Sequence, residues 1–284
     1  MRVLSTLLYF IVYRIVRYRR GVVRENLERS FPEKGERERR DIERRYYHHL
    51  CDLLVEGIHN LYAGRGSILR HYRIENREVV DRYYSQGKSV ILLSQHHNNW
   101  EYMVSSLDMQ FYHHGVGVGK PLDDKASAGY ITRRRTRYGT EVVDQTNVRE
   151  VMAYYEKYHV PCCYMMLSDQ SPSNVHKSYW TMFLHQETPF LYGAEYFARK
   201  YNYPVIYYTV KKTRRFHYTV LLEVMSENPA STEQYAIERD YIRRLEQLLE
   251  QEPEYWLWSH KRWKRKRLPE IPLHESPKKS PTIV

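Results

Sequence analysis

The sequence predicts an α/β fold with a mostly parallel central sheet flanked by helices. Apolar runs of strand length alternate along the chain with segments of helical periodicity. Strands that are separated by helices favour a parallel sheet covered on both faces. The 284 residues contain no repeat at a fixed period, which excludes a solenoid and suits one large domain.

The chain opens with an apolar segment, residues 3–16, with the sequence VLSTLLYFIVYRIV. A helix that spans a membrane needs ~20 apolar residues, and Arg14 interrupts this one, so we expect it to reach into one leaflet. Four arginines follow, which suits an anionic cytoplasmic leaflet: Arg17, Arg19, Arg20 and Arg24. The position of this cluster and the missing small-residue cleavage site disfavour a secretory signal. We therefore predict a membrane-anchoring helix over residues 1–20, with a buried core helix as the alternative.

Periodicity then places the other elements. Ile42, Tyr46, Leu50, Leu53 and Ile58 recur at helical spacing and predict an amphipathic helix over residues 36–62. Strand-like runs occupy residues 89–94, 141–144, 160–167, 204–210 and 217–224. Helical stretches lie near residues 101–112, 124–138, 147–158, 190–201 and 232–250. We expect one domain over residues 21–265, followed by a basic, proline-spotted and disordered tail over residues 266–284.

Charge and cysteine content restrict the partners. The 45 Lys and Arg against 34 Asp and Glu give a formal net charge of +11, which attracts phosphates, anionic lipid headgroups or acidic proteins. Cys51, Cys162 and Cys163 form no CxxC pair. Neither a disulfide framework nor a metal site is indicated, and we expect a reduced, cytosol-facing protein.

The motif HHNNWE, residues 96–101, follows the apolar run 89–93. Positions five apart on one helix point about 140° away from each other, so His96 and Glu101 can meet only across a turn. The two asparagines favour that turn, Glu101 would begin the next helix, and Trp100 would wall one side. A histidine held by a carboxylate is a general base, which indicates acyl transfer onto a hydroxyl. Alone, the pattern is weak, because both histidines can be ordinary polar loop residues.

The order of several blocks resembles the bacterial lipid A late acyltransferases. These blocks are RYRRGVVRENLERSFPEK at 17–34, HHNNWE, KPLDDKASAGYITRRRTRYGTEVVD at 120–144, LSDQSP with FLHQETPFLYGAEYFARK downstream, and YWLWSHKRWKRK near the end. The resemblance covers nearly the whole chain. It implies a fold like that of glycerol-3-phosphate acyltransferase, with His96 as the base and Glu101 as the acid that orients it. The apolar segment is shorter than the family's usual membrane helix, and His97 and Asn98 stand where relatives often have an aromatic residue and a glycine, so His97 is a rival base.

Further site residues follow from motif position and from the predicted sheet. Arg137 is the candidate for the oxyanion by its motif position, with a solvated face as the alternative. Asp169 and Gln170 lie in a turn after the strand 162–167, and parallel sheets bind ligands at the carboxyl ends of their strands. We therefore expect them near His96, although Asp169 can also be a simple turn cap. Arg149 is a candidate contact for phosphate.

The resemblance also implies substrates and location. Acyl carrier protein would be the acyl donor and co-substrate, with no other cofactor, and a lipid A precursor would be the acceptor. The enzyme would act at a membrane surface, on the cytoplasmic face of the inner membrane of a Gram-negative bacterium. The alternatives are an acyltransferase that uses a lysophospholipid or an amino-acid lipid, with acyl-coenzyme A as donor, or a basic nucleic-acid-binding protein. We expect no binding of nucleic acid, because that function leaves HHNNWE and SDQSP without a purpose.

Overall fold

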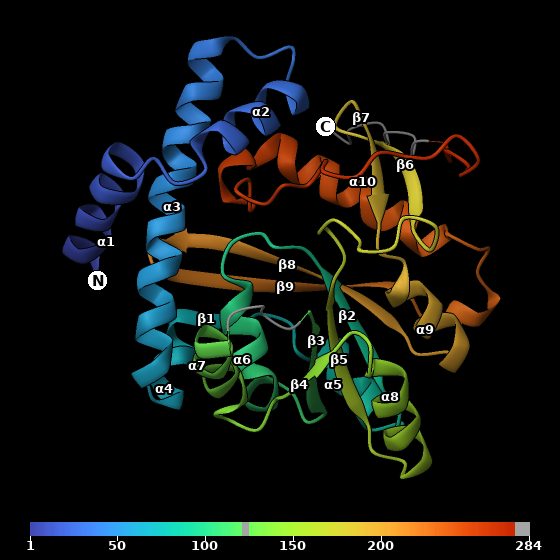
Figure 1. Ribbon diagram of the computed structural model, residues 1–284. Helices are drawn as coiled ribbons and strands as arrows, with labels where there is room; N and C mark the ends of the chain where they lie inside the picture. The colour runs from blue at the N-terminus through green and yellow to red at the C-terminus, as the bar shows by residue number, and fades with distance from the viewer. Residues whose placement is uncertain (121–124, 276–284) are drawn as a thin grey trace. The chain divides into compact units, whose positions relative to one another are not determined.

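The computed structural model describes residues 1–120 and 125–275 (Figure 1). The helices are α1 (Arg2–Tyr9), α2 (Arg20–Ser30), α3 (Glu36–Tyr62), α4 (Arg65–His71), α5 (Glu78–Tyr84), α6 (Trp100–Gln110), α7 (Lys125–Thr136), α8 (Val148–Lys157), α9 (Gly193–Tyr201) and α10 (Ala236–Gln251). The strands are β1 (Tyr72–Ile74), β2 (Val90–Ser94), β3 (His114–Gly119), β4 (Glu141–Asp144), β5 (Cys162–Leu167), β6 (Tyr179–Phe183), β7 (Gln186–Phe190), β8 (Val205–Arg214) and β9 (His217–Ser226).

The described chain forms two compact units. The first unit comprises residues 1–55, 168–193 and the described residues from 233 onward, and the second comprises residues 56–167 and 194–232. The domain predicted over residues 21–265 therefore includes parts of both units.

The second unit contains a seven-stranded sheet in the order β1-β9-β8-β2-β5-β3-β4. The pairs β8–β2, β2–β5, β5–β3 and β3–β4 are parallel, as is β1–β9, while β8 and β9 pair antiparallel. The register places Ser94 of β2 opposite Leu167 of β5, so the carboxyl ends of these strands lie side by side. The predicted α/β fold with a mostly parallel sheet is confirmed.

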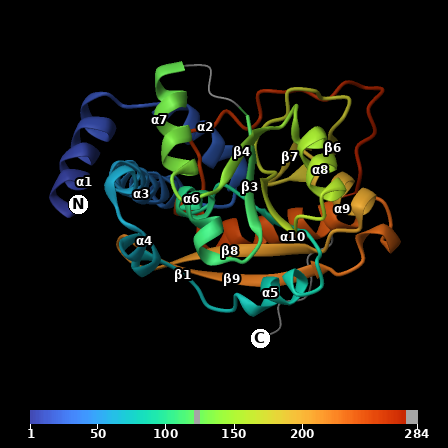
Figure 2. The same ribbon diagram turned by 90° about the horizontal axis from the view of Figure 1, so that it is seen from below.

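One face of this sheet holds the main core of the second unit. Alternate residues of a strand point to opposite faces, and Val90 and Leu92 of β2 join Met165 of β5 and Ile206 of β8 on this one. The helices α4, α5 and α6 contribute buried side chains to the same cluster, among them Ile68, Val80 and Leu107. Helix α7 lies beside α6 (Figure 2). The core thus fixes α6, the helix that begins within the HHNNWE motif, against the sheet.

Strand β3 was not predicted, because its sequence HGVGVG is poor in strand-forming residues. Its glycines have a packing function, since α6 lies directly against them. A Cβ added at Gly115 would lie 2.4 Å from Cβ of Leu107, and one added at Gly117 would lie 2.5 Å from Cγ2 of Val104. Close packing of α6 therefore requires glycine at these positions.

The N-terminal segment is two helical pieces, α1 and a π-helical segment, Phe10–Ile15. Its polar and aromatic side chains face α3: the Ser5 hydroxyl donates to Asp52 at 2.6 Å, and the Tyr9 ring stacks on His48 with 3.5 Å between centroids. The apolar side chains are exposed, with Val3 85 % and Leu7 57 % accessible, so α1 is not a core helix. Across the residues that the structure describes, no helix has the length and apolar character that crossing a bilayer requires.

In the first unit, the C-terminal segment packs on α2 and on the β6–β7 hairpin. The side-chain amide of Asn26 donates to the carbonyls of Trp258 and His260, and Trp263 Nε1 donates to Thr188 Oγ1 at 2.8 Å. Within the predicted disordered tail, Ile271 is buried and His274 bridges to Thr181. Residues 276–284 lie outside the described residues, as do residues 121–124 of the third block.

The packing of β3 against α6 gives a stability prediction. In Gly117→Ala the new methyl group must displace Val104, so we expect the free energy of unfolding to fall by about 1–3 kcal/mol, measured by urea denaturation. Gly119→Ala is the matched control on the same strand, because no heavy atom lies within 4 Å of its Cβ position. Equal stability of the two variants would contradict this account of β3.

Candidate functional site

The turn after β2 is hydrogen-bonded to the neighbouring strand β8. Ser94 Oγ donates to the carbonyl of Tyr208 at 2.7 Å, and the Tyr207 hydroxyl donates to Gln95 Oε1 at 3.0 Å. Asn98 has a left-handed backbone, with φ of 53°, and its side-chain amide donates to the carbonyl of Val210 at 2.7 Å. Asparagine tolerates this conformation better than most residues, which explains its place in the motif. The predicted turn is confirmed.

The helix that follows begins with a side-chain cap. Asn99 Oδ1 accepts from the backbone N–H of Tyr102 at 3.0 Å, and its Nδ2 donates to Glu56 at 3.1 Å. The same carboxylate oxygen of Glu56 accepts from the Tyr218 hydroxyl at 2.9 Å. A buried carboxylate on α3 therefore connects the cap of α6 to strand β9. Neither Glu56 nor this connection was predicted, since α3 gives no sequence signal that singles out one of its acids.

The two histidines of the motif have different surroundings. His96 is partly exposed, and its ring meets Trp100 edge to face with 5.0 Å between centroids, as predicted for the wall of the site. His97 is only 1 % exposed, and its Nδ1 lies 3.2 Å from the Asn98 amide nitrogen. That amide also donates to Val210, so its nitrogen faces His97 and His97 Nδ1 must accept. A substrate hydroxyl can reach His96 more easily than His97.

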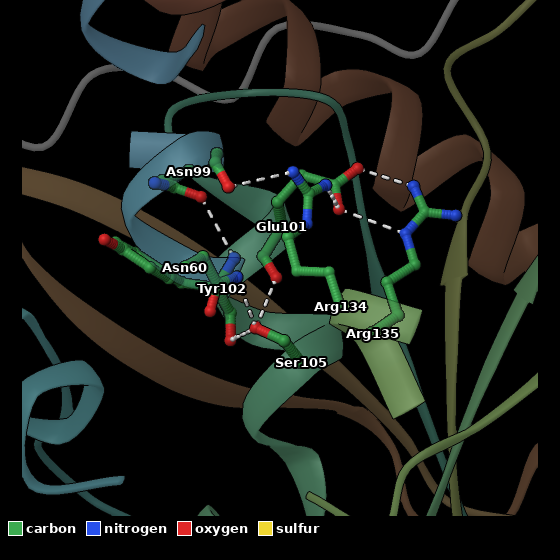
Figure 3. Close-up of polar contacts among 8 residues, drawn as sticks. Asn60, Asn99, Glu101, Tyr102, Ser105, Arg134 and Arg135 are labelled. Carbon is green, nitrogen blue, oxygen red and sulfur yellow. Dashed lines mark hydrogen bonds and ion pairs between the residues drawn. The ribbon is translucent and has the colours of Figure 1, made fainter. Parts of the chain in front are cut away.

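Glu101 lies in the first turn of α6, as predicted, and forms ion pairs with two arginines of α7 (Figure 3). Arg135 binds both carboxylate oxygens, with Nε at 3.0 Å and Nη2 at 2.5 Å. Arg134 Nη2 donates to Glu101 Oε2, and Arg134 Nη1 lies 3.5 Å from the carbonyl of Gly57. The carboxylate thus joins α6 to α7.

These contacts set the charge of the cluster. Burial acts to raise the pKa of Glu101, but the guanidinium groups of Arg135 and Arg134 outweigh it and lower the pKa to about 2. Glu101 is therefore ionised at neutral pH, which is the state that an orienting acid needs. Two guanidinium groups against one carboxylate leave an excess of positive charge beside the motif. A direct bond from Glu101 to His96 stays a prediction.

The other predicted arginines have contacts of their own. Arg137 Nη1 donates to the carbonyl of Leu61 at 2.6 Å, at the end of α3, which is a helix-capping contact. Arg134 and Arg135, which were not predicted to belong to the site, are the arginines that form ion pairs with Glu101. Arg149 is exposed at the start of α8, and its Nη2 lies 3.3 Å from the Tyr196 hydroxyl. An oxyanion role for Arg137 and a phosphate role for Arg149 stay predictions.

Asp169 and Gln170 belong to the first unit, whereas His96 belongs to the second. Asp169 is buried, and its Oδ2 accepts from Trp256 Nε1 at 2.7 Å. The neighbouring Ser171 donates its backbone N–H to His260 Nε2 at 3.1 Å. The tryptophan-rich segment therefore fixes the SDQSP turn, which sequence reasoning missed because the two blocks are distant along the chain. The predicted approach of Asp169 and Gln170 to His96 stays a prediction.

Residues 2–265 match the family described as bacterial lipid A biosynthesis acyltransferase. The chain belongs to this family. The match includes the α1 segment, the HHNNWE motif, the arginine helix α7 and the tryptophan-rich segment. No curated protein sequence matches the chain. The resemblance inferred from the sequence is confirmed, and it makes the protein an enzyme that transfers acyl groups to lipids.

The pKa of Glu101 predicts how stability depends on pH. A free glutamate has a pKa of about 4.3, and the arginines beside Glu101 lower its pKa to about 2 in the folded chain. The ionised form therefore stabilises the fold above the unfolded pKa, and this contribution is lost as the pH falls toward 2. We expect the stability difference between the wild type and Glu101→Gln, from urea denaturation, to shrink between pH 5 and pH 2.

The matched control is Glu25→Gln, which removes an exposed acid that pairs with Arg29 on α2. Exposed pairs of this kind contribute little, so we expect a small difference from the wild type at every pH. A difference for Glu101→Gln that stays constant through this pH range would show that the arginine pairs do not stabilise its ionised form.

Proposed function

We propose that this acyltransferase moves a fatty acyl chain from acyl carrier protein to a hydroxyl group of a lipid A precursor. The single observation that supports the mechanism most is the partly exposed His96, held after a buried parallel strand by a turn that is pinned to β8. This is the edge of a parallel sheet at which ligands bind.

His96 acts as the general base. It takes the proton of the acceptor hydroxyl while the oxygen attacks the thioester carbonyl, and the carbon–sulfur bond breaks as the tetrahedral intermediate collapses. The leaving thiolate takes the proton from the His96 imidazolium, so the histidine returns to its neutral state without a covalent enzyme intermediate. Trp100 against the imidazole limits the rotation of the ring and excludes water from one side.

Glu101 stabilises the imidazolium that forms on His96. Its low pKa keeps it ionised throughout the reaction. Arg134 and Arg135 hold it at the start of α6, and their excess positive charge favours the oxyanion of the intermediate. Arg137 is the predicted direct donor to that oxyanion.

The proposed substrates are consistent with the charge of the chain. Acyl carrier protein and the phosphates of a lipid A precursor are acidic, and the chain has a net charge of +11. A lysophospholipid or an amino-acid lipid as acceptor, or acyl-coenzyme A as donor, requires the same His96 chemistry. Substrate assays separate these alternatives from the proposed reaction.

The α1 segment is the proposed contact with the membrane. A helix of a soluble domain normally buries its apolar side chains, whereas α1 turns Ser5 inward and Val3, Leu4 and Leu7 outward. This inverted polarity, with arginines following, suits a helix that lies in the lipid interface. The proposed location is the cytoplasmic face of the bacterial inner membrane.

The catalytic proposal predicts that His96→Ala lowers kcat by ~100- to 10,000-fold, the usual contribution of a general base. The assay combines acyl carrier protein charged with different acyl chains and a tetra-acylated lipid A precursor, with product measured by mass spectrometry. The same assay with acyl-coenzyme A or a lysophospholipid identifies the true donor and acceptor.

His97→Ala is the matched comparison, since His97 is the neighbouring histidine but is buried. Circular dichroism verifies that both variants fold. We expect kcat of His97→Ala to exceed that of His96→Ala by at least tenfold. A folded His96→Ala with wild-type turnover would exclude the proposed base, and loss of turnover in His97→Ala alone would assign the base to His97.

The membrane proposal predicts that Leu7→Glu/Phe10→Glu lowers binding to vesicles of phosphatidylglycerol and phosphatidylethanolamine by at least tenfold in co-sedimentation. Both side chains are more than half exposed, so the fold should persist. Tyr154→Glu/Tyr158→Glu, in α8 and at the residue after it, is the control, because these side chains are 57 % and 56 % exposed. A similar loss of binding in both variants would show that added charge, not α1, determines the result.

A further inference from the structure

The second unit contains a basic pocket outside the HHNNWE motif. It is lined by Leu69, Arg70 and His71 of α4, Arg73 of β1, and Arg214 and His217 of the β8–β9 hairpin. Its volume is about 530 Å³, within the range of ~300–1,000 Å³ that is usual for small-molecule sites. Figures 1 and 2 show α4 beside β1 and the end of this hairpin. We call these six residues the hairpin pocket.

The arginines of the hairpin pocket differ from those of α7. Arg134 and Arg135 are neutralised in part by Glu101. Arg70, Arg73 and Arg214 are exposed, and none of them pairs with a carboxylate in the part of the chain that the structure describes. The lining includes no acid. Three arginines that line one pocket without an acid among its residues form a site for an anion with several oxygens, because guanidinium donates in a fork that matches phosphate.

Two histidines complete the lining. The rings of His71 and His217 are 4.5 Å apart, and His59 lies behind them, 5.4 Å from His71. The Nδ1 atoms of His71 and His217 lie against the carbonyls of Ser67 and Arg215, so each of these nitrogens must be the donor. Nε2 of each ring is then the atom that gains a proton when the ring becomes charged. Burial is the main cause that lowers the pKa of His217, and the positive charges of His71 and Arg214 lower it further. A bound anion would counteract these positive charges and raise the pKa of His217.

We propose that the hairpin pocket binds a phosphomonoester group, with Arg70, Arg73 and Arg214 as ligands and His71 and His217 as additional donors. The ligand has two possible sources, free phosphate or the headgroup of a phosphorylated lipid. The assignment to the acceptor lipid rests on the proposed function, whereas the assignment to phosphate rests on the pocket alone.

The pocket lies on the same strand as the site. The carbonyl of Val210 on β8 accepts from Asn98 of the motif, and Arg214 ends that strand four residues later. At roughly 3.3 Å per residue, Arg214 is about 13 Å along β8 from the turn that holds His96. A phosphate bound there would position a lipid whose reacting hydroxyl is one sugar unit or more away from the phosphate. The pocket would therefore select acceptors by headgroup.

The binding experiment uses the full chain, made catalytically inactive by His96→Ala, with inorganic phosphate and short-chain phosphatidic acid as probes. Isothermal titration calorimetry compares this protein with the same protein carrying Arg73→Gln/Arg214→Gln. We expect phosphate affinity to fall at least tenfold and the pKa of His217, from NMR titration, to rise with phosphate only when both arginines are present. Lys157→Gln/Lys200→Gln removes two exposed charges elsewhere in the same unit and should change affinity less than twofold.

Tighter binding of phosphatidic acid than of inorganic phosphate supports a lipid headgroup as the ligand, and the reverse order supports free phosphate. Equal affinity in the arginine variant and its parent, or an equal loss in the lysine control, overturns the proposal.

A separate acylation assay on the active chain compares acceptors with and without phosphate. The arginine variant should raise KM at least tenfold for the phosphorylated acceptor alone. Failure of acylation in the wild type would count against the proposed function and leave the binding result intact.

Discussion

The backbone at Asn98 is the constraint on which the site depends. Strand β2 is buried along its whole length, so the chain must leave the sheet abruptly to bring a polar residue to solvent. Asn98 has a left-handed backbone, and its side-chain amide fixes the chain to Val210 of β8. This turn leaves His97 inside and His96 partly exposed, and it starts α6 so that Glu101 falls in the first turn. The hydrogen bond of Asn98 thus helps to place His96, His97 and Glu101.

The sequence predicted those helices and strands in which apolar residues recur at regular spacing or form a continuous run. The helix predicted over residues 36–62 has the observed bounds Glu36–Tyr62, and the strands predicted near 89–94 and 141–144 are β2 and β4. Strand β3 was missed because glycine has a low strand propensity. Gly115 and Gly117 are needed for the close packing of α6, which is a tertiary contact that the local sequence does not show. The short elements α4, α5 and β1 were missed because three to seven residues are too few to establish a period.

The turn between His96 and Glu101 was predicted, but the ion pairs of Glu101 were not. A turn between His96 and Glu101 follows from spacing alone, since five residues on one helix cannot face each other. The choice among the arginines of α7 does not, because neighbouring residues on a helix differ by about 100° and only the packing of α7 against α6 shows which face meets Glu101. Arg137 instead donates to the Leu61 carbonyl at the end of α3, and Asp169 accepts from Trp256, which is far along the chain. These contacts join segments that are far apart in the sequence, so a local sequence pattern cannot predict them.

Arginine is used in two ways in the second unit, and the difference bears on the kind of substrate. Arg134 and Arg135 are partly neutralised by Glu101, and these ion pairs hold α6 and α7 together, so only their excess charge acts on another anion. The arginines of the hairpin pocket have no carboxylate partner among the described residues, so their positive charge is available to attract an anionic ligand. A nucleic-acid-binding protein would also need such charge, but it would gain nothing from an α1 that exposes Val3, Leu4 and Leu7. The proposed function accounts for each feature separately, since a membrane would cover the apolar side chains of α1 and a phosphorylated acceptor would supply an anion to the hairpin pocket.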